Sequence, residues 1–169
     1  EKLTQVGFTQ PEAILDRYAF QLSGGMAQRV TIALALCSQA KLLIADEPTN
    51  GLDQDSKQQT LSLLNDLFPD AAKLVITHDI SVAATCGRIL VLCGGKMLET
   101  GSSALVLAAP RHPYTQALLG ALVENGMQET PILRPETGPC PFYRRCPTAF
   151  GQCRAEIPRR TQGDREWWC

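Results

Sequence analysis

The sequence predicts an α/β fold built around a parallel sheet, with a small cysteine-rich module at its carboxyl end. Short apolar runs without alternation predict strands that are buried on both faces, and amphipathic segments between them predict helices. The last 30 residues hold four of the seven cysteines and five of the ten aromatic residues, and this shift in composition predicts the module.

The helices are predicted from capping residues and from apolar residues that recur three or four positions apart. Pro11 stands early in a helix over residues 10–19. Ser23 is placed as the N-cap of a helix over residues 26–37. Two further helices are expected over residues 55–68 and 80–85.

The strands are predicted from short apolar runs, and the first two end in ionisable residues. They lie over residues 42–45, 73–77 and 88–92, and a Gly-Gly turn then leads into a hairpin strand over residues 96–99. This alternation of strands and helices is typical of an α/β layer. From Leu118 onward a helix fades, and residues 131–139 are expected to be a linker.

Composition excludes several classes of protein. The chain has 169 residues, with 44% hydrophobic and 20% charged residues, which is typical of a soluble globular protein. No apolar run reaches the ~18 residues that a membrane helix needs. The net charge of −1 averages a balance of −4 over the first 133 residues and +3 over the rest. The basic tail contains no long run of arginine, so we interpret it as ordinary surface and expect no nucleic-acid partner.

Ionisable residues follow two neighbouring strands at the edge where an open parallel sheet binds its ligands. Asp46 and Glu47 follow the first strand, and His78 follows the second. One carboxylate is suited to hold a metal ion through water, the next to polarise an attacking water, and the imidazole to orient that water or hold a phosphate. The alternative is that all three lie in ordinary solvated loops.

A second candidate site is the sequence Ser23-Gly24-Gly25 at a helix start. Unpaired backbone N–H groups and the helix dipole attract phosphate there, although the same sequence also occurs in ordinary loops and caps. The sequence G-x-x-x-x-G-K-[ST], which grips the phosphates of a nucleotide, is absent from the chain.

Together these stretches resemble the motifs of ABC-transporter ATPases, in their order and spacing. The resemblance covers the signature motif (22–29), the Walker B strand (42–49), the D-loop (50–53) and the switch-histidine loop (77–79). It implies the carboxyl-terminal part of a P-loop NTPase domain, with its parallel sheet and part of its helical subdomain. Ala27 and Gly51 depart from the usual residues of related importers, but neither change removes a catalytic group.

The resemblance implies a role for each candidate residue, with ATP and Mg²⁺ as cofactors. Asp46 helps to hold Mg²⁺, Glu47 is the general base on the hydrolytic water, and His78 contacts the γ-phosphate. The remaining roles fall to residues that face a partner subunit: Ser23, Gly24, Gly25 and Gln28 at the partner's nucleotide, and Asp53 at the dimer interface.

Residues 112–119 resemble the segment that closes the ATPase core in oligopeptide, dipeptide and nickel importers. The four cysteines that follow resemble a pattern that holds a four-iron cluster in some of these ATPases, although zinc or four reduced thiols are alternatives. These candidate ligands are Cys140, Cys146, Cys153 and Cys169. The other three cysteines (Cys37, Cys86 and Cys93) are expected to pack in the core.

We therefore expect residues 1–110 to be the carboxyl-terminal part of an ABC ATPase domain, and residues 111–169 an importer-type extension with its cysteine module at 140–169. The expected protein is an ATPase subunit at the cytoplasmic face of the inner membrane. Its partners would be a second ATPase subunit, two membrane permease subunits and, indirectly, a solute-binding protein for peptides, nickel or metal chelates. Without a phosphate loop the 169 residues are expected to be inactive alone. A soluble ABC ATPase of DNA repair or translation is the alternative.

Overall fold

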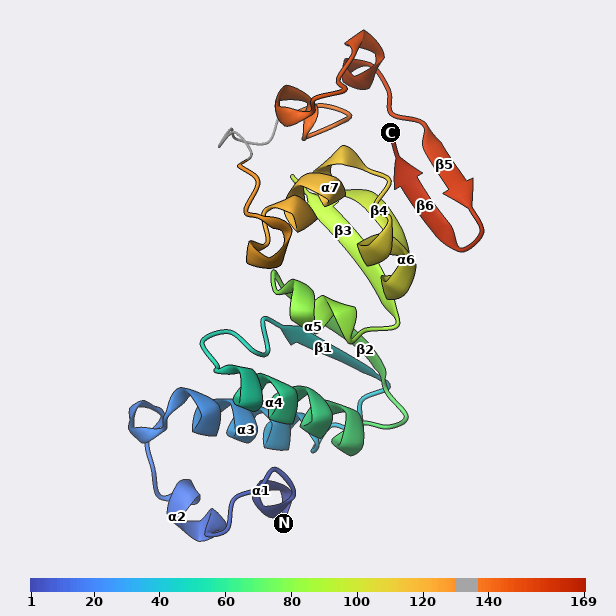
Figure 1. Ribbon diagram of the computed structural model, residues 1–169. Coiled ribbons are helices and arrows are strands. Elements are labelled where there is room, and N and C mark those ends of the chain that lie inside the picture. Colours follow the sequence, from blue (N-terminus) through green and yellow to red (C-terminus); the bar gives the residue numbers. More distant parts are fainter. Residues whose placement is uncertain (130–136) are drawn as a thin grey trace. The chain divides into compact units, whose positions relative to one another are not determined.

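The computed structural model describes residues 1–129 and 137–169, which form two compact units, Glu1–His78 and Asp79–Cys169 (Figure 1). The first unit contains a two-stranded sheet, and the second contains a four-stranded sheet in the order β3-β4-β6-β5. Most of the expected linker over 131–139 lies outside the described residues.

The first unit follows the expected order of helices and strands. Ser23 is the N-cap of α3, as predicted, and its side chain accepts a hydrogen bond from the backbone N–H of Met26. The helix expected over 10–19 is shorter and is followed by a separate 3-10 turn. The elements are α1 (Lys2–Gln5), α2 (Pro11–Leu15), η1 (Ala19–Gln21), α3 (Gly24–Ala35), β1 (Leu42–Asp46), α4 (Gln54–Leu67) and β2 (Ala72–Ile76).

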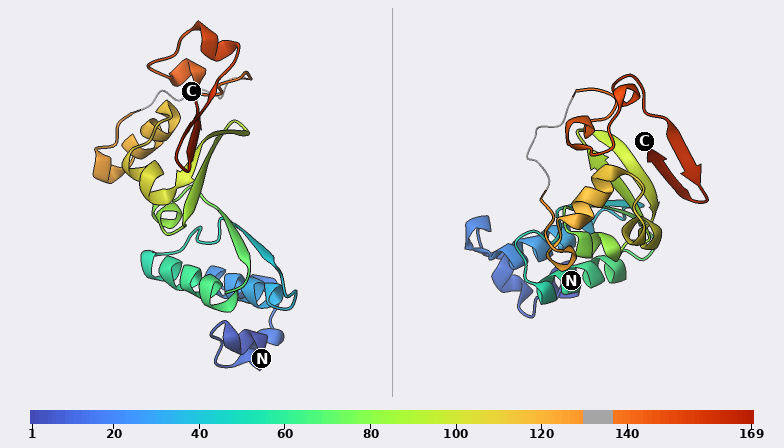
Figure 2. Two further views of the ribbon diagram at one scale, coloured as in Figure 1. Left: turned by 90° about the vertical axis from the view of Figure 1, so that its right-hand side faces the viewer. Right: turned by 45° about the horizontal axis from the view of Figure 1, so that its top comes forward.

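Strands β1 and β2 are parallel, with Leu42 opposite Ala72 and Asp46 opposite Ile76. Helices α3 and α4 lie against one face of this sheet (Figure 2). The half-buried Leu43 and Ala45 of that face pack on a core cluster, whose buried members are Val6, Ile32, Ala33, Leu64 and Phe68. Burying a valine, isoleucine, leucine or phenylalanine side chain stabilises a fold by about 1.5–3 kcal/mol.

The expectation that these strands are buried on both faces is wrong for the described residues. Leu42 and Ile44 are 54% and 58% exposed, and Leu74 and Ile76 are 50% and 46% exposed. Side chains alternate between the two faces of a strand, so all four lie on the face that α3 and α4 do not cover. The apolar runs correctly indicated strands in a parallel sheet, but the helices of the first unit cover only one of its faces.

The second unit combines short helices with an antiparallel sheet. Its elements are α5 (Ile80–Ala84), β3 (Arg88–Cys93), β4 (Lys96–Ser102), α6 (Ser103–Ala108), α7 (Pro113–Gly120), β5 (Arg159–Gln162) and β6 (Arg165–Trp168), with 3-10 turns η2 (Val123–Asn125), η3 (Tyr143–Arg145) and η4 (Gly151–Arg154). The hairpin of β3 and β4 confirms the expected Gly-Gly turn, because Gly94 and Gly95 have φ values of 53° and 75°. The strand over 88–92 thus pairs with the next strand in this hairpin, as expected.

A buried ionic cluster ties the end of the chain to the rest of this unit. Glu99 on β4 is fully buried and accepts the backbone N–H groups of Arg111 and His112, each at 2.9 Å. Arg165 on β6, also buried, lies with its Nε 3.7 Å from Glu99 Oε1 and donates to the carbonyl of Leu105. Strand β6 pairs with β4 beside this cluster, so the last residues are part of the second unit's sheet.

Helix α7 begins next to this cluster and contains most of the segment 112–119 described above. His112 is its N-cap, and the imidazole Nδ1 accepts a hydrogen bond from the backbone N–H of Tyr114 at 2.9 Å. Burial lowers the pKa of His112 from 6.5 to about 4, and the carboxylate of Glu99 opposes this change. Phe142 packs near both rings, with centroids 6.4 Å from His112 and 5.4 Å from Tyr114.

Candidate functional site

The start of α3 presents backbone N–H groups beside an open surface. Ser23 Oγ accepts the N–H of Met26 at 3.3 Å, which leaves the hydroxyl hydrogen free to donate outward. A Cβ placed on Gly24 or on Gly25 would meet no atom within 4 Å. The first turn of a helix has no intrahelical partners for its N–H groups and carries a partial positive charge. The arrangement therefore suits an anion that approaches the glycines closely.

The carboxylate and the imidazole predicted at neighbouring strand ends lie together. The backbone N–H of Glu47 donates to the carbonyl of Ile76 at 2.8 Å, which continues the pairing of β1 with β2 beyond Asp46. Glu47 Oε1 lies 2.8 Å from Nδ1 of His78. His78 remains 75% exposed and Glu47 33% exposed, so solvent and ligands reach both groups. A general base beside an imidazole at this edge is suited to activate a water next to a phosphate.

The loop between β1 and α4 is closed by short-range hydrogen bonds. The N–H of Asn50 donates to the carbonyl of Glu47 at 3.1 Å, and the N–H of Leu52 donates to the carbonyl of Thr49 at 3.3 Å. Thr49 is buried, and Gly51 has a φ of 72°, a conformation that glycine adopts without strain. Gly51 is therefore well suited to this turn.

Asp53, expected at a dimer interface, caps helix α4. Its carboxylate accepts the backbone N–H of Ser56 at 2.9 Å and the Ser56 hydroxyl at 2.7 Å. These two hydrogen bonds hold the pKa of Asp53 below its usual value. The expected role at an interface stays a prediction, and capping is a second role that the sequence analysis did not assign.

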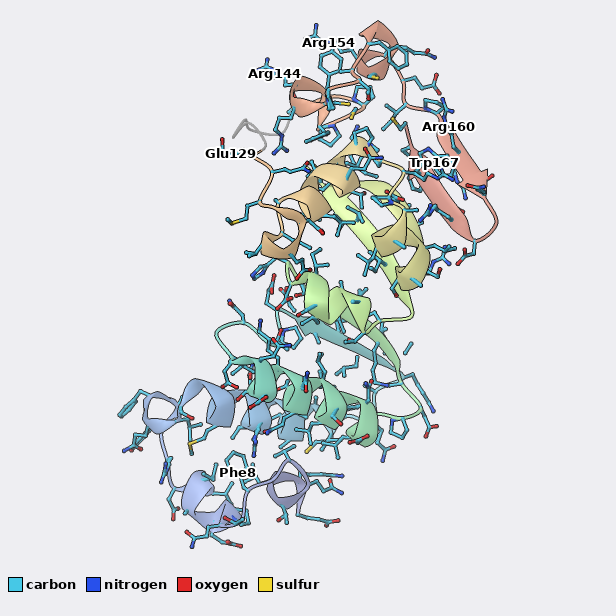
Figure 3. The ribbon with its side chains drawn as sticks, viewed as in Figure 1. Phe8, Glu129, Arg144, Arg154, Arg160 and Trp167 are labelled. Carbon is cyan, nitrogen blue, oxygen red and sulfur yellow. The ribbon has the colours of Figure 1, made fainter. Side chains whose placement is uncertain are left out.

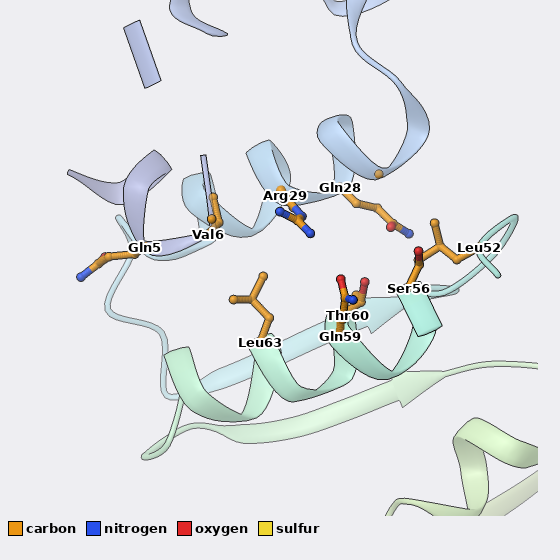
Figure 4. A pocket seen from close by; sticks show the side chains of 11 residues that line it. Gln5, Val6, Gln28, Arg29, Leu52, Ser56, Gln59, Thr60 and Leu63 are labelled. Atoms are coloured by element: carbon orange, nitrogen blue, oxygen red, sulfur yellow. The ribbon is translucent and has the colours of Figure 1, made fainter. Parts of the chain in front are cut away.

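Gln28, expected at a nucleotide, has a partner within the chain. Its Nε2 donates to the carbonyl of Pro48 at 2.5 Å. The side chain borders a cavity of about 250 Å³ between α1, the start of α3 and the start of α4 (Figure 4). Gly25, Leu52 and Ser56 line the same cavity. No sequence pattern indicated this contact, because its acceptor is a backbone carbonyl 20 residues away.

The four carboxyl-terminal cysteines influence one another electrostatically but do not form a ligand set. Burial raises the pKa of Cys140, and the charges of the other three thiols raise it further. Burial also raises the pKa of Cys169, as do Cys146 and Cys153. Within residues 1–129 and 137–169, however, no group of three or more His, Cys, Asp or Glu side chains is arranged to hold a metal ion.

The other three cysteines only partly meet the expectation of core packing. Cys93 is buried and Cys86 is half-buried, but Cys37 is exposed at the end of α3, where its Sγ lies 3.5 Å from the carbonyl of Ala33. The apolar spacing that placed Cys37 inside continues one turn beyond the buried part of the helix.

Arginines of the basic tail lie over aromatic rings. Arg144 and Arg154 lie on the 3-10 turns and Arg160 on β5 (Figure 3). The guanidinium of Arg154 lies 4.5 Å from the centre of the Tyr143 ring, and Arg159 lies 6.0 Å from that of Trp168. Such a pair is worth about 0.5–1 kcal/mol at an exposed site, so Arg154 and Arg159 contribute to the stability of this region.

Comparison with known proteins shows which families the chain resembles. Residues 1–50 match the family described as ABC transporter, and residues 98–153 match the family described as oligopeptide/dipeptide transporter, C-terminal region. The dipeptide transport ATP-binding protein DppD of Escherichia coli is 44% identical over 168 residues, which cover 92% of this chain and 51% of DppD. Over most of its length the chain is similar to ABC transporter ATP-binding proteins.

Other ABC proteins show the same relationship. A probable peptide ABC transporter ATP-binding protein of Sinorhizobium fredii, y4tR, is 40% identical over 94% of this chain and 51% of its own length. The ATP-binding cassette MJ0796, solved as a dimer in a post-hydrolysis state with ADP and Pi, shares 33% identity and a TM-score of 0.53 over 60% of this chain and 44% of its own. The chain thus spans about half the length of the curated relatives it matches. In the part of the chain that the structure describes, no helix is long and apolar enough to cross a membrane.

Proposed function

We propose that this chain forms part of the ATP-hydrolysing subunit of an ABC importer for small peptides. The observation that carries the proposal is the contact of Glu47 with His78 at the carboxyl ends of two parallel strands. Relatives named for dipeptide transport and for glutathione import favour a peptide cargo over nickel or a metal chelate.

In this proposal Glu47 takes a proton from the water that attacks the γ-phosphorus of ATP, and ADP leaves as the bond to the β-phosphate breaks. His78 orients Glu47 and contacts the γ-phosphate. Asp46 is the residue that would hold Mg²⁺, which neutralises phosphate charge when it is bound. Ser23, Gly24 and Gly25 would receive the γ-phosphate of the nucleotide that a second ATPase subunit holds, since the open surface beside them fits an anion.

The partners and the location follow from the same proposal. Asp53 would lie at the interface with the second ATPase subunit, and two membrane permease subunits would hold the pair at the cytoplasmic face of the inner membrane. Co-purification of the tagged subunit with permease proteins is the expected result. Recovery with ribosomes or DNA instead would favour a soluble ABC ATPase of translation or DNA repair.

The decisive experiment measures phosphate release by the complete subunit that contains this chain, with or without Glu47→Gln. We expect the variant to bind ATP and to lose turnover by about 100-fold or more, because an amide cannot accept the proton. Glu124→Gln replaces an exposed carboxylate in the second unit and serves as the matched control. Full turnover by Glu47→Gln would refute the assignment. The 169 residues alone are expected to release no phosphate, since they lack the phosphate loop.

We also propose that the four carboxyl-terminal cysteines bind a four-iron cluster in the cell. Their order and spacing support this, because they resemble the cysteine pattern that holds such a cluster in some related ATPases. The ligands must move closer together for the cluster to bind. Protein purified without oxygen should contain iron and sulfide, which a variant with these cysteines changed to serine should lack and Cys86→Ser should keep. Colourless protein without iron would refute the cluster. Stoichiometric zinc in such protein would indicate a zinc site instead.

A further inference from the structure

One hydrogen bond joins helix α3, which begins with Gly24 and Gly25, to the loop that carries Glu47. It runs from Nε2 of Gln28, in the second turn of α3, to the carbonyl of Pro48 at 2.5 Å. Gln28 thus connects the helix whose start suits a phosphate with the residue that follows the general base. We propose that Gln28 is a positioning residue, which holds Glu47 at a fixed place relative to Ser23–Gly25 and does not itself contact the nucleotide.

The backbone of Glu47 needs such support. Its φ of 47° is left-handed, a conformation that residues other than glycine adopt only where the surroundings hold them in it. On one side the N–H of Glu47 is bonded to the carbonyl of Ile76, and its own carbonyl accepts the N–H of Asn50. On the other side Pro48 has a fixed φ and no N–H to donate, so its carbonyl is the polar backbone group through which α3 reaches the loop.

Close packing does not provide this connection. The cavity of about 250 Å³ lies between the start of α3 and the start of α4, with Gly25 and Gln28 on one side and Leu52 and Ser56 on the other. In Figure 4 the amide of Gln28 extends toward the end of the cavity where Leu52 and Ser56 lie. Because the cavity leaves space between these two walls, packing at the cavity does not fix the distance between them, and a directed bond is needed there. Gln28 supplies that bond.

The inference rests on the proposed hydrolysis of ATP and specifies how its general base is held. A base acts only within hydrogen-bond reach of the proton it takes, and a misplacement of about 1 Å costs about 100-fold in rate. Loss of the bond to Pro48 should therefore lower kcat and leave KM for ATP nearly unchanged. A residue that bound the nucleotide directly would raise KM instead.

The experiment compares variants of Gln28 in the complete subunit that contains this chain. Gln28→Met keeps the length of the side chain but removes the donor, and Gln28→Glu keeps its shape but places a carboxylate against the Pro48 carbonyl. We expect kcat to fall about tenfold or more in both, with KM changed by less than about twofold. Gln28→Lys, which restores a donor, should recover part of kcat. Gln59→Met changes a glutamine that lines the same cavity from α4 and should behave as the wild type.

A second readout does not depend on catalysis. Amide hydrogen exchange at Glu47 and Asn50 should be faster in Gln28→Met than in the wild type, while exchange at the β1–β2 ladder stays unchanged. A raised KM with unchanged kcat, or unchanged exchange in the folded variant, would overturn the proposal. If the wild-type subunit does not hydrolyse ATP, the proposed function fails, and the exchange measurement alone still decides the positioning role.

Discussion

The buried imidazole of His112 makes the stability of the second unit depend on pH. His112 is 1% exposed, and burial lowers its pKa from 6.5 to about 4, against the opposing effect of the Glu99 carboxylate. The unfolded chain therefore takes up a proton at this residue at a higher pH than the folded chain does. Stability from this group is complete above about pH 6.5 and is lost as the pH falls from there toward 4.

The size of the effect follows from the two pKa values. A gap from 6.5 to about 4 corresponds to a loss of about 3 kcal/mol in the free energy of unfolding at pH 4, and about 2 kcal/mol at pH 5. Below pH 4 the contribution of this group changes little, because both states are protonated. The carboxylate of Glu99 lies beside this residue, because it accepts the backbone N–H of His112 at 2.9 Å.

The variant His112→Asn isolates the contribution of the imidazole. Asparagine is a good N-cap, so its side-chain oxygen can accept the N–H of Tyr114 as Nδ1 does, but it does not titrate. Urea denaturation is followed by the fluorescence of Trp167 and Trp168, which both lie on β6 of the second unit. From pH 7.5 to pH 5 the wild type should lose about 2 kcal/mol more than the variant. Equal losses in the two proteins would refute the reasoning.

Three further predictions concern named contacts. Glu99→Ala should destabilise the second unit by about 3–5 kcal/mol in urea denaturation, because it leaves the buried Arg165 without a counter-charge; a loss below about 1 kcal/mol would show that water replaces the carboxylate. Glu166→Gln removes the exposed pair with Arg159, so the urea midpoint should hardly move, and a large drop at low salt would contradict this. Ser23→Ala removes the cap of α3 and should cost about 1 kcal/mol, measured by thermal unfolding of the first unit, whereas Ser23→Asp should preserve the cap.

Local signals in the sequence predicted the elements of the first unit well. Ser23 before a run of apolar residues at helical spacing located α3, and abrupt apolar runs located β1 and β2. These signals lie within one helix or strand, so they do not depend on contacts with the rest of the chain. The exposed face of the sheet was not predictable in the same way, because an apolar run specifies what a strand needs to bury and not which segment covers it.

The second unit was harder to predict because its contacts join distant residues. The hairpin of the strands over 88–92 and 96–99 was predicted from its local Gly94-Gly95 turn, but the pairing of β6 was not. Strand β6 pairs with β4 across more than 60 residues, and Glu99 reaches Arg165 beside it. Nothing in the sequence near Glu99 indicates a carboxylate that will be fully buried.

In the candidate site too, the sequence predicted which residue types are present but not all of their contacts. Glu47 and His78 were predicted to lie at one edge of the sheet, and this follows because the carboxyl ends of parallel strands meet there. Gln28 was expected at a nucleotide because its position in the motif implied it, yet its amide nitrogen is bonded to the carbonyl of Pro48. A backbone carbonyl is present at every residue, so no pattern of residue types marks the one that Gln28 selects. The chemical groups of such a site are thus predictable from its residue types, while the position of Glu47 relative to those groups depends on contacts that only the fold specifies.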